Sequence, residues 1–175
     1  MSDEASTFDD TLFPNGPPRN KGELDQLIEL YKLMVASSET LVSRRQNVNT
    51  FFLTINTLLL SASGIVINAG SDSSFKAAGL AIIGMTGGIL SITWLRLLKS
   101  LGQLNRGKFA VINRLELTLT AAIYLAEWQA LGEGKDPKKY SPSTSREAWI
   151  PWTFLGLYCL TTICSVAVAV GVVVI

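Results

Sequence analysis

The sequence predicts an all-α integral membrane protein with three transmembrane helices and a cytoplasmic helical layer. Of its 175 residues, 48% are hydrophobic and only 17% are charged, whereas a soluble domain carries about 25% charged residues. Three stretches reach the roughly 20 apolar residues that a membrane-spanning helix needs. The apolar residues outside these stretches recur at helical spacing, which favours helices there as well.

The N-terminal region is expected to remain outside the membrane. Residues 1–21 are acidic, contain Pro14, Pro17 and Pro18, and have no apolar signal segment. We predict a disordered acidic tail for them. Residues 22–48 have apolar side chains every three or four positions. This pattern predicts a cytoplasmic amphipathic helix that runs directly into the first span.

The remaining elements follow from hydropathy and helix breakers. Residues 49–69, 75–98 and 152–175 are predicted to form transmembrane helices 1, 2 and 3. Between the last two, residues 99–150 predict a long cytoplasmic helix over 99–131 and then a loop of glycine, proline and charged residues. Cys159 and Cys164 fall inside the third span and are expected to be reduced.

Charge placement predicts the orientation. Lys76 is the one basic residue between the first two spans, and the other lysines and arginines precede the first span or lie between Arg96 and Arg146. Because basic residues favour the cytoplasmic side, we expect a multi-pass protein with a cytoplasmic N-terminus. Trp94, Trp149 and Trp152 lie near span ends, where tryptophans often anchor a helix at the membrane interface.

The first span carries polar and small residues on one side. One row has spacings of 4, 3, 4, 3 and 4 residues, a second runs beside it at seven-residue spacing, and both face away from most of the large apolar side chains. The rows are Thr50, Thr54, Thr57, Ser61, Gly64 and Asn68, and Asn49, Asn56 and Ser63. The second span offers small residues that include a GxxxG motif at Gly84 and Gly88.

Two interpretations of this polar side remain open. Hydroxyls and amides hydrogen-bond between helices, and small residues allow close approach, so the rows suit helix–helix packing. Polar groups deep in a bilayer also line water-filled paths. If the rows are packing surfaces, Asn56→Leu is expected to weaken assembly.

Two stretches resemble known families: SETLVSRRQNVNTFFLTINTLLLSASG at 38–64 and KFAVINRLELTLTAAIYLAEWQ at 108–129. They resemble the RipA family of small bacterial octameric membrane proteins and, more distantly, the SLATT class of membrane effectors. The resemblance implies a homo-oligomer, an octamer, in the bacterial inner membrane. The matching residues are Arg44, Arg45, Asn49, Lys108, Phe109, Glu116, Glu127 and Trp128.

The charged residues in these stretches have two interpretations that do not exclude each other. Arg44 and Arg45 suit the membrane surface, where they would contact lipid phosphate. They would also suit an ion pair with Glu116 or Glu127, which are eleven residues apart and would share one face of an unbroken helix. The sequence has no histidine and no nucleophile or phosphate-loop motif, so we expect no catalytic residue, no cofactor, no metal site and no enzyme activity.

Two functions are consistent with these features. The first is a scaffold or signalling platform that binds an unknown cytoplasmic protein through its cytoplasmic helices. The second is an oligomeric channel or pore-forming effector in a stress or anti-phage response. In either case the expected partners are further copies of the chain and a bilayer with anionic lipid, and not nucleic acid.

Overall fold

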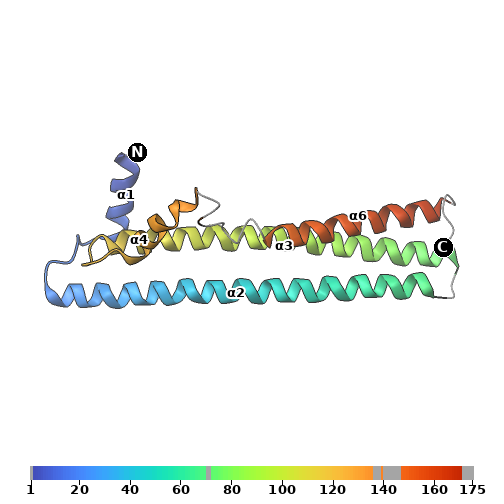
Figure 1. Cartoon of the computed structure of the whole chain (residues 1–175), viewed down its shortest axis with the longest axis horizontal. Coiled ribbons are helices and arrows are strands. Elements are labelled where there is room, and N and C mark those ends of the chain that lie inside the picture. The colour runs from blue at the N-terminus through green and yellow to red at the C-terminus, as the bar shows by residue number, and fades with distance from the viewer. Residues whose placement is uncertain (1, 70–71, 136–138, 140–146, 171–175) are drawn as a thin grey trace. The chain divides into compact units, whose positions relative to one another are not determined.

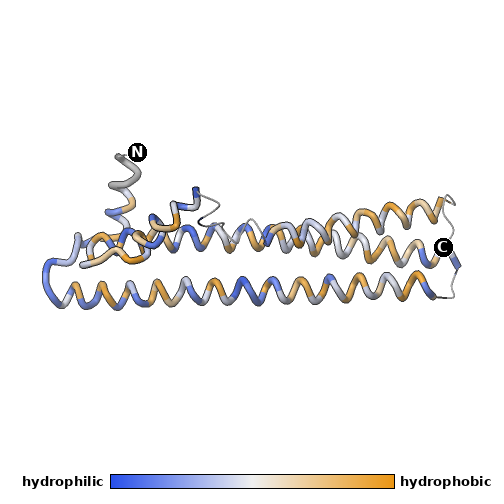
Figure 2. The backbone as a smooth tube through the Cα atoms, viewed as in Figure 1, coloured by the Kyte–Doolittle hydropathy of each residue, from blue (hydrophilic) through white to orange (hydrophobic). Residues whose placement is uncertain are grey.

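A computed structural model describes residues 2–69, 72–135, 139 and 147–170. In these residues every regular element is a helix, and three of the helices are long and apolar enough to cross a membrane, which confirms the all-α membrane class (Figures 1 and 2). The elements are α1 (Ser2–Leu12), α2 (Lys21–Asn68), α3 (Ser73–Glu116), α4 (Ile123–Ala130), the 3-10 helix η1 (Gly132–Gly134) and α6 (Trp149–Ala169).

The chain divides into two compact units. Unit 1 comprises Met1–Val42 and Gln103–Ser141, and unit 2 comprises Ser43–Gly102 and Pro142–Ile175. Unit 1 contains α1, the beginning of α2, the end of α3, α4 and η1, whereas unit 2 contains the three apolar helical segments. The unit boundaries at residues 42 and 102 lie close to the predicted boundaries at 48 and 98. The assignment of the two units to cytoplasm and membrane stays a prediction.

A capping box begins α2. The Glu23 N–H donates to the Asn20 side-chain oxygen (2.9 Å), and the Glu23 carboxylate accepts from the Asn20 amide (2.8 Å) and the Arg19 N–H (2.7 Å). Such reciprocal bonds satisfy N–H groups that have no partner within a first helical turn. From this start α2 continues without a break through the predicted amphipathic helix and the first span, as the sequence pattern predicted.

The predicted disordered tail is corrected over residues 2–12, where the structure has α1. A helix this short is not stable alone in water. In unit 1 it is held by a tertiary ion pair, in which the Arg114 guanidinium on α3 donates from Nε and Nη2 to the two carboxylate oxygens of Asp9. The sequence pattern contains no sign of this pairing.

The predicted helix over 99–131 is also corrected, because α3 ends at Glu116 and α4 begins at Ile123. The break lies in a Leu-Thr-Leu-Thr stretch, in which Thr118 and Thr120 have low helix propensity. The N–H groups of Thr118 and Leu119 turn back to the carbonyls of Leu115 (3.0 Å) and Glu116 (3.0 Å). Glu116 and Glu127 therefore lie on different helices.

The helix that contains the predicted third span, α6, begins at Trp149, three residues before the predicted start of the span. Pro151 is the third residue of α6, a position where proline costs no helical hydrogen bond. The predicted end of this span, residues 171–175, lies outside the described residues, as do 136–138 and 140–146 of the predicted loop.

An aromatic core joins the three helices of unit 2. Phe52 on α2 stacks on Trp94 of α3 with ring centroids 5.6 Å apart and planes at 8°. The ring centroid of Trp94 lies 6.3 Å from that of Phe154 on α6, and the ring centroids of Phe154 and Tyr158 are 6.4 Å apart. Trp94 is only 1% exposed, so its predicted role as a membrane-surface anchor is wrong, whereas Trp149 and Trp152 are 65% and 60% exposed.

Candidate functional site

The structure separates the two polar rows of the first span. Asn56 is fully buried and Asn49 and Ser63 are half-buried, so this row faces α3 and α6 within the chain. The other row is exposed. At 100° per residue its centre lies roughly 140° around α2 from the buried side. Its exposed members are Thr50, Thr54, Thr57, Ser61 and Asn68.

The exposed row satisfies its own hydrogen-bonding groups. Thr54, Thr57, Ser61 and Asn68 each donate to the carbonyl oxygen four residues earlier in α2, at 2.8 to 3.0 Å. Gly64 lies in the same row, and a Cβ built there would meet nothing within 4 Å among the described residues. We call the surface formed by these six residues the outer row: Thr50, Thr54, Thr57, Ser61, Gly64 and Asn68.

The inner polar residues bind α2 to the other two helices. The Trp94 indole N–H donates to the Asn49 side-chain oxygen (2.9 Å), and the Asn49 amide donates to Glu147 (3.0 Å). The Arg45 guanidinium lies 2.8 Å from the same Glu147 carboxylate. The sequence analysis offered Glu116 or Glu127 as the ion-pair partner of Arg45, but the observed partner is Glu147, in a stretch predicted as loop. Arg44 is exposed.

Asn56 acts inside the chain as well. Its amide donates to the Phe52 carbonyl (2.7 Å), and its backbone oxygen accepts from the Tyr158 hydroxyl of α6 (3.0 Å). Tyr158 is 1% exposed, and the sequence analysis missed it although it is the one tyrosine in the third span. Asn56→Leu is therefore not a test of contacts between chains.

The glycines of α3 pack against two neighbours: Gly79 lies against Val66 of α2, whereas Gly84 and Gly87 lie against α6. A Cβ on Gly87 would overlap the Tyr158 ring, and one on Gly84 would overlap the Thr162 hydroxyl and lie 3.2 Å from the Tyr158 carbonyl. Gly88 has room, because the nearest atom, in Leu155, is 3.9 Å away. The close-approach pair is thus Gly84 and Gly87. Of the two glycines of the GxxxG motif, Gly84 is packed tightly against α6, and Gly88 lies at an ordinary packing distance from it.

Unit 1 contains a buried carboxylate where three helices meet. Glu116, at the end of α3, is 1% exposed. It accepts hydrogen bonds from the Tyr31 hydroxyl on α2 (2.8 Å) and from the Tyr124 and Leu125 N–H groups (both 3.0 Å) at the start of α4. Burial and then the bond to Glu116 raise the pKa of the Tyr31 phenol. We call this cluster the Glu116 junction; Glu127 is exposed and lies outside it.

The Glu116 junction has a clear electrostatic basis. A negative charge is favourable at the N-terminus of a helix, where N–H groups without intrahelical partners give a partial positive charge. No side chain caps α4 from its own N-terminal residue Ala122, so Glu116 takes this role from another helix. The junction therefore fixes α4 on α2 and α3.

The Asp9–Arg114 ion pair predicts a pH dependence for α1. Hydrogen bonds from Arg114, and then its charge, lower the pKa of the Asp9 carboxyl against the opposite effect of desolvation. A lowered pKa in the folded state means that the pair stabilises α1 above the ordinary aspartate pKa of about 3.9 and is lost as the pH falls through the lower value. We expect the amide-exchange protection factors of residues 2–12 to fall over that pH range.

Two variants provide the controls for this pH experiment. Asp9→Asn is expected to release α1 at pH 7 and to remove the pH dependence. The side chain of Asp10 is exposed, so Asp10→Asn should leave α1 protected at pH 7 and should keep the pH dependence. An Asp9→Asn protein with the pH profile of the unchanged chain would contradict this role of the pair.

These features define a multi-pass α-helical membrane protein. The chain belongs to the octameric membrane protein family (8xMP), whose profile matches residues 28–167. It is thus a homo-oligomeric membrane protein, and the match names neither the RipA family nor the SLATT class. No curated protein and no solved structure matches the chain.

Proposed function

We propose that the homo-oligomer is a membrane scaffold or signalling platform in the bacterial inner membrane, with unit 1 in the cytoplasm binding a partner protein. The observation that carries this proposal is the internal satisfaction of the outer row. Four of its side chains, those of Thr54, Thr57, Ser61 and Asn68, donate to carbonyls of their own helix. They need neither water nor ions, and they present small surfaces that suit close packing between helices.

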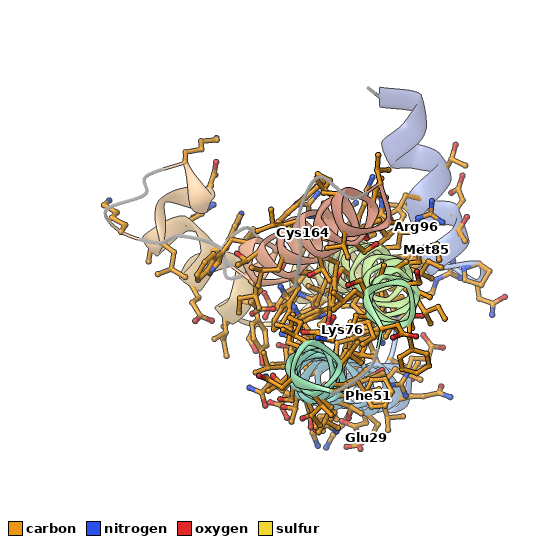
Figure 3. All side chains as sticks on the ribbon, turned by 90° about the vertical axis from the view of Figure 1, so that its right-hand side faces the viewer. Glu29, Phe51, Lys76, Met85, Arg96 and Cys164 are labelled. Atoms are coloured by element: carbon orange, nitrogen blue, oxygen red, sulfur yellow. The ribbon has the colours of Figure 1, made fainter. Side chains whose placement is uncertain are left out.

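The charges at one end of unit 2 support the proposed orientation. Arg44 on α2 and Arg96 and Lys99 on α3 are exposed there, and Arg96 lies on the side of α3 turned away from α2 (Figure 3). The exposed Trp149 and Trp152 belong to the same end. Basic and aromatic side chains together suit a cytoplasmic membrane surface with anionic lipid.

The Glu116 junction supports a binding platform more than an enzyme. It is a buried carboxylate with three donors, and it fixes helices instead of leaving a reactive group accessible. The sequence has no histidine, and no group of three or more potential metal ligands occurs within the described ranges. The proposal therefore includes no catalytic role, no cofactor and no nucleic-acid partner.

A channel or pore-forming effector is the second candidate. The observation that favours it is the exposure of the outer row, because hydroxyls turned away from their own chain would line an axis if eight copies of α2 faced it. Their internal hydrogen bonds weigh against this arrangement, since a lining group exchanges such bonds with water.

Ion flux separates the two candidates. For the octamer reconstituted in liposomes of anionic and zwitterionic lipid, we expect no flux above that of protein-free liposomes for small cations or anions. A steady conductance that changes in Thr57→Val, a replacement of similar shape without the hydroxyl, would instead assign the outer row to a pore. Leu58→Val, on the apolar side next to the row, is the matched control.

A further inference from the structure

Unit 2 has a second surface that is not covered within the chain. A shallow groove runs between α3 and α6 and is lined by Gly84, Gly88, Tyr158, Cys159, Thr162 and Ile163. Cys159 is exposed and Ile163 is 65% exposed. A Cβ on Gly88 would have only Leu155 near it, at 3.9 Å, so the missing side chain leaves this part of the groove open.

The groove and the outer row belong to different sides of unit 2. Every residue that lines the groove is on α3 or α6. The outer row lies on α2 and is turned away from both of those helices, which contact α2 through Phe52, Asn56 and their neighbours. A protomer thus carries a ridge of small side chains on one side and a groove on another.

The polar groups of both surfaces are satisfied before any contact forms. The Thr162 hydroxyl in the groove donates to the Tyr158 carbonyl (2.8 Å), as the outer-row hydroxyls donate within α2. Two such surfaces can pack closely without leaving a donor unpaired in the membrane, and contact between helices there depends on such packing.

We propose that the outer row of α2 docks in the α3–α6 groove of the next copy of the chain, head to tail around the octamer. The octameric family requires each copy to contact others, and a ring with one rotation axis needs two different complementary surfaces on each chain. The proposal rests on the homo-oligomer and extends the packing role proposed for the outer row. In this arrangement the outer row lies between neighbouring copies and does not line the central axis of the ring.

The ring geometry fixes which residues meet. Rotation about an axis along the membrane normal keeps every residue at its own depth, so contacts between neighbours join residues of equal depth. The Tyr158 hydroxyl contacts the Asn56 backbone, which places the next residues along each helix, Thr57 and Cys159, at similar depth. Thr57 of one copy therefore meets Cys159 of the next.

Cysteine cross-linking in the intact membrane-embedded octamer tests this contact. The chain has two cysteines, so Thr57→Cys with Cys164→Ser leaves position 57 and the native Cys159 as the two thiols. Oxidation with copper phenanthroline is expected to give a ladder of covalent species up to eight chains, because every interface joins one Thr57→Cys to one Cys159. The ladder should disappear when Cys159→Ser is added.

A control at a different depth uses Asn68→Cys in place of Thr57→Cys. Residue 68 belongs to the same row but lies eleven residues further, about 16 Å at 1.5 Å per residue. Disulfides need Cα atoms within about 7 Å, so no ladder is expected. A second pair, Ser61→Cys with Ile163→Cys in a chain that lacks both native cysteines, repeats the test one turn deeper with a different α2 substitution.

Two results would overturn the proposal. Dimers that form from Thr57→Cys even in the Cys159→Ser chain would show that α2 meets α2 of another copy. Failure of both cysteine pairs to cross-link in particles that retain the size of the octamer would exclude the groove as the contact. Neither result depends on ion flux, so the docking proposal and the scaffold proposal can fail separately.

Discussion

Replacing Glu116 by alanine is expected to release α4 from α2 and α3. The substitution removes a buried acceptor and leaves the Tyr31 hydroxyl and the Tyr124 and Leu125 N–H groups without their partner. Each buried donor without a partner costs about 1–3 kcal/mol. Since the losses do not simply add, we expect unit 1 to be destabilised by roughly 3 kcal/mol or more.

Amide hydrogen exchange measures this effect where it arises. The protection of residues 123–130 should fall in Glu116→Ala, and more moderately in Tyr31→Phe, which removes one of the three donors. Glu127→Gln is the matched control, because Glu127 is exposed on the same α4 and surface changes usually stay within about 0.5 kcal/mol. Unchanged protection of α4 in Glu116→Ala would show that other contacts hold it.

Replacing Gly87 by alanine is expected to separate α6 from α3. The new methyl group would overlap the ring of Tyr158, which is 1% exposed and is held by its hydrogen bond to Asn56. Gly84→Ala would also press on the α6 backbone, 3.2 Å from the Tyr158 carbonyl and 3.3 Å from the Thr162 nitrogen. Overpacking of this kind typically costs about 1–3 kcal/mol.

Gly88→Ala is the matched control on the same helix. The nearest atom to its new Cβ is 3.9 Å away, an ordinary packing distance, so we expect the stability of the unchanged chain. The measurement is the denaturant midpoint of the detergent-solubilised protein, with the fluorescence of Trp94 in the aromatic core as the probe. Equal midpoints for Gly87→Ala and Gly88→Ala would contradict the close approach of α6 at Gly87.

The two polar rows of the first span show what helical periodicity can predict and what it cannot. Spacings of three and four residues correctly group Thr50, Thr54, Thr57 and Ser61 on one face of a helix. Periodicity gives the angle between two side chains but not which angle faces the neighbouring helices. The structure places Asn56 inside and Thr57 outside, and this difference moves the predicted assembly contact from one row to the other.

The charged residues show a different limit. The sequence has no proline between Pro18 and Pro137, which predicts one unbroken helix with Glu116 and Glu127 on the same face. The helix nevertheless ends at Glu116, whose carboxylate accepts hydrogen bonds from Tyr31 and from the first turn of α4. Arg45 and Glu147 are far apart in the sequence, and no local pattern predicts that they meet.

The sequence by itself determined the class of this protein: three apolar helices, their order, the continuity of α2, and the presence of small and polar residues within the first span. Hydropathy and helical periodicity are local properties, so composition and spacing reveal them. Only the tertiary structure decided that α1 is helical, that Glu116 caps α4, that Gly84 and Gly87 admit α6, and which polar row is covered. Each of these depends on contacts between different helices, which no pattern within a single helix contains.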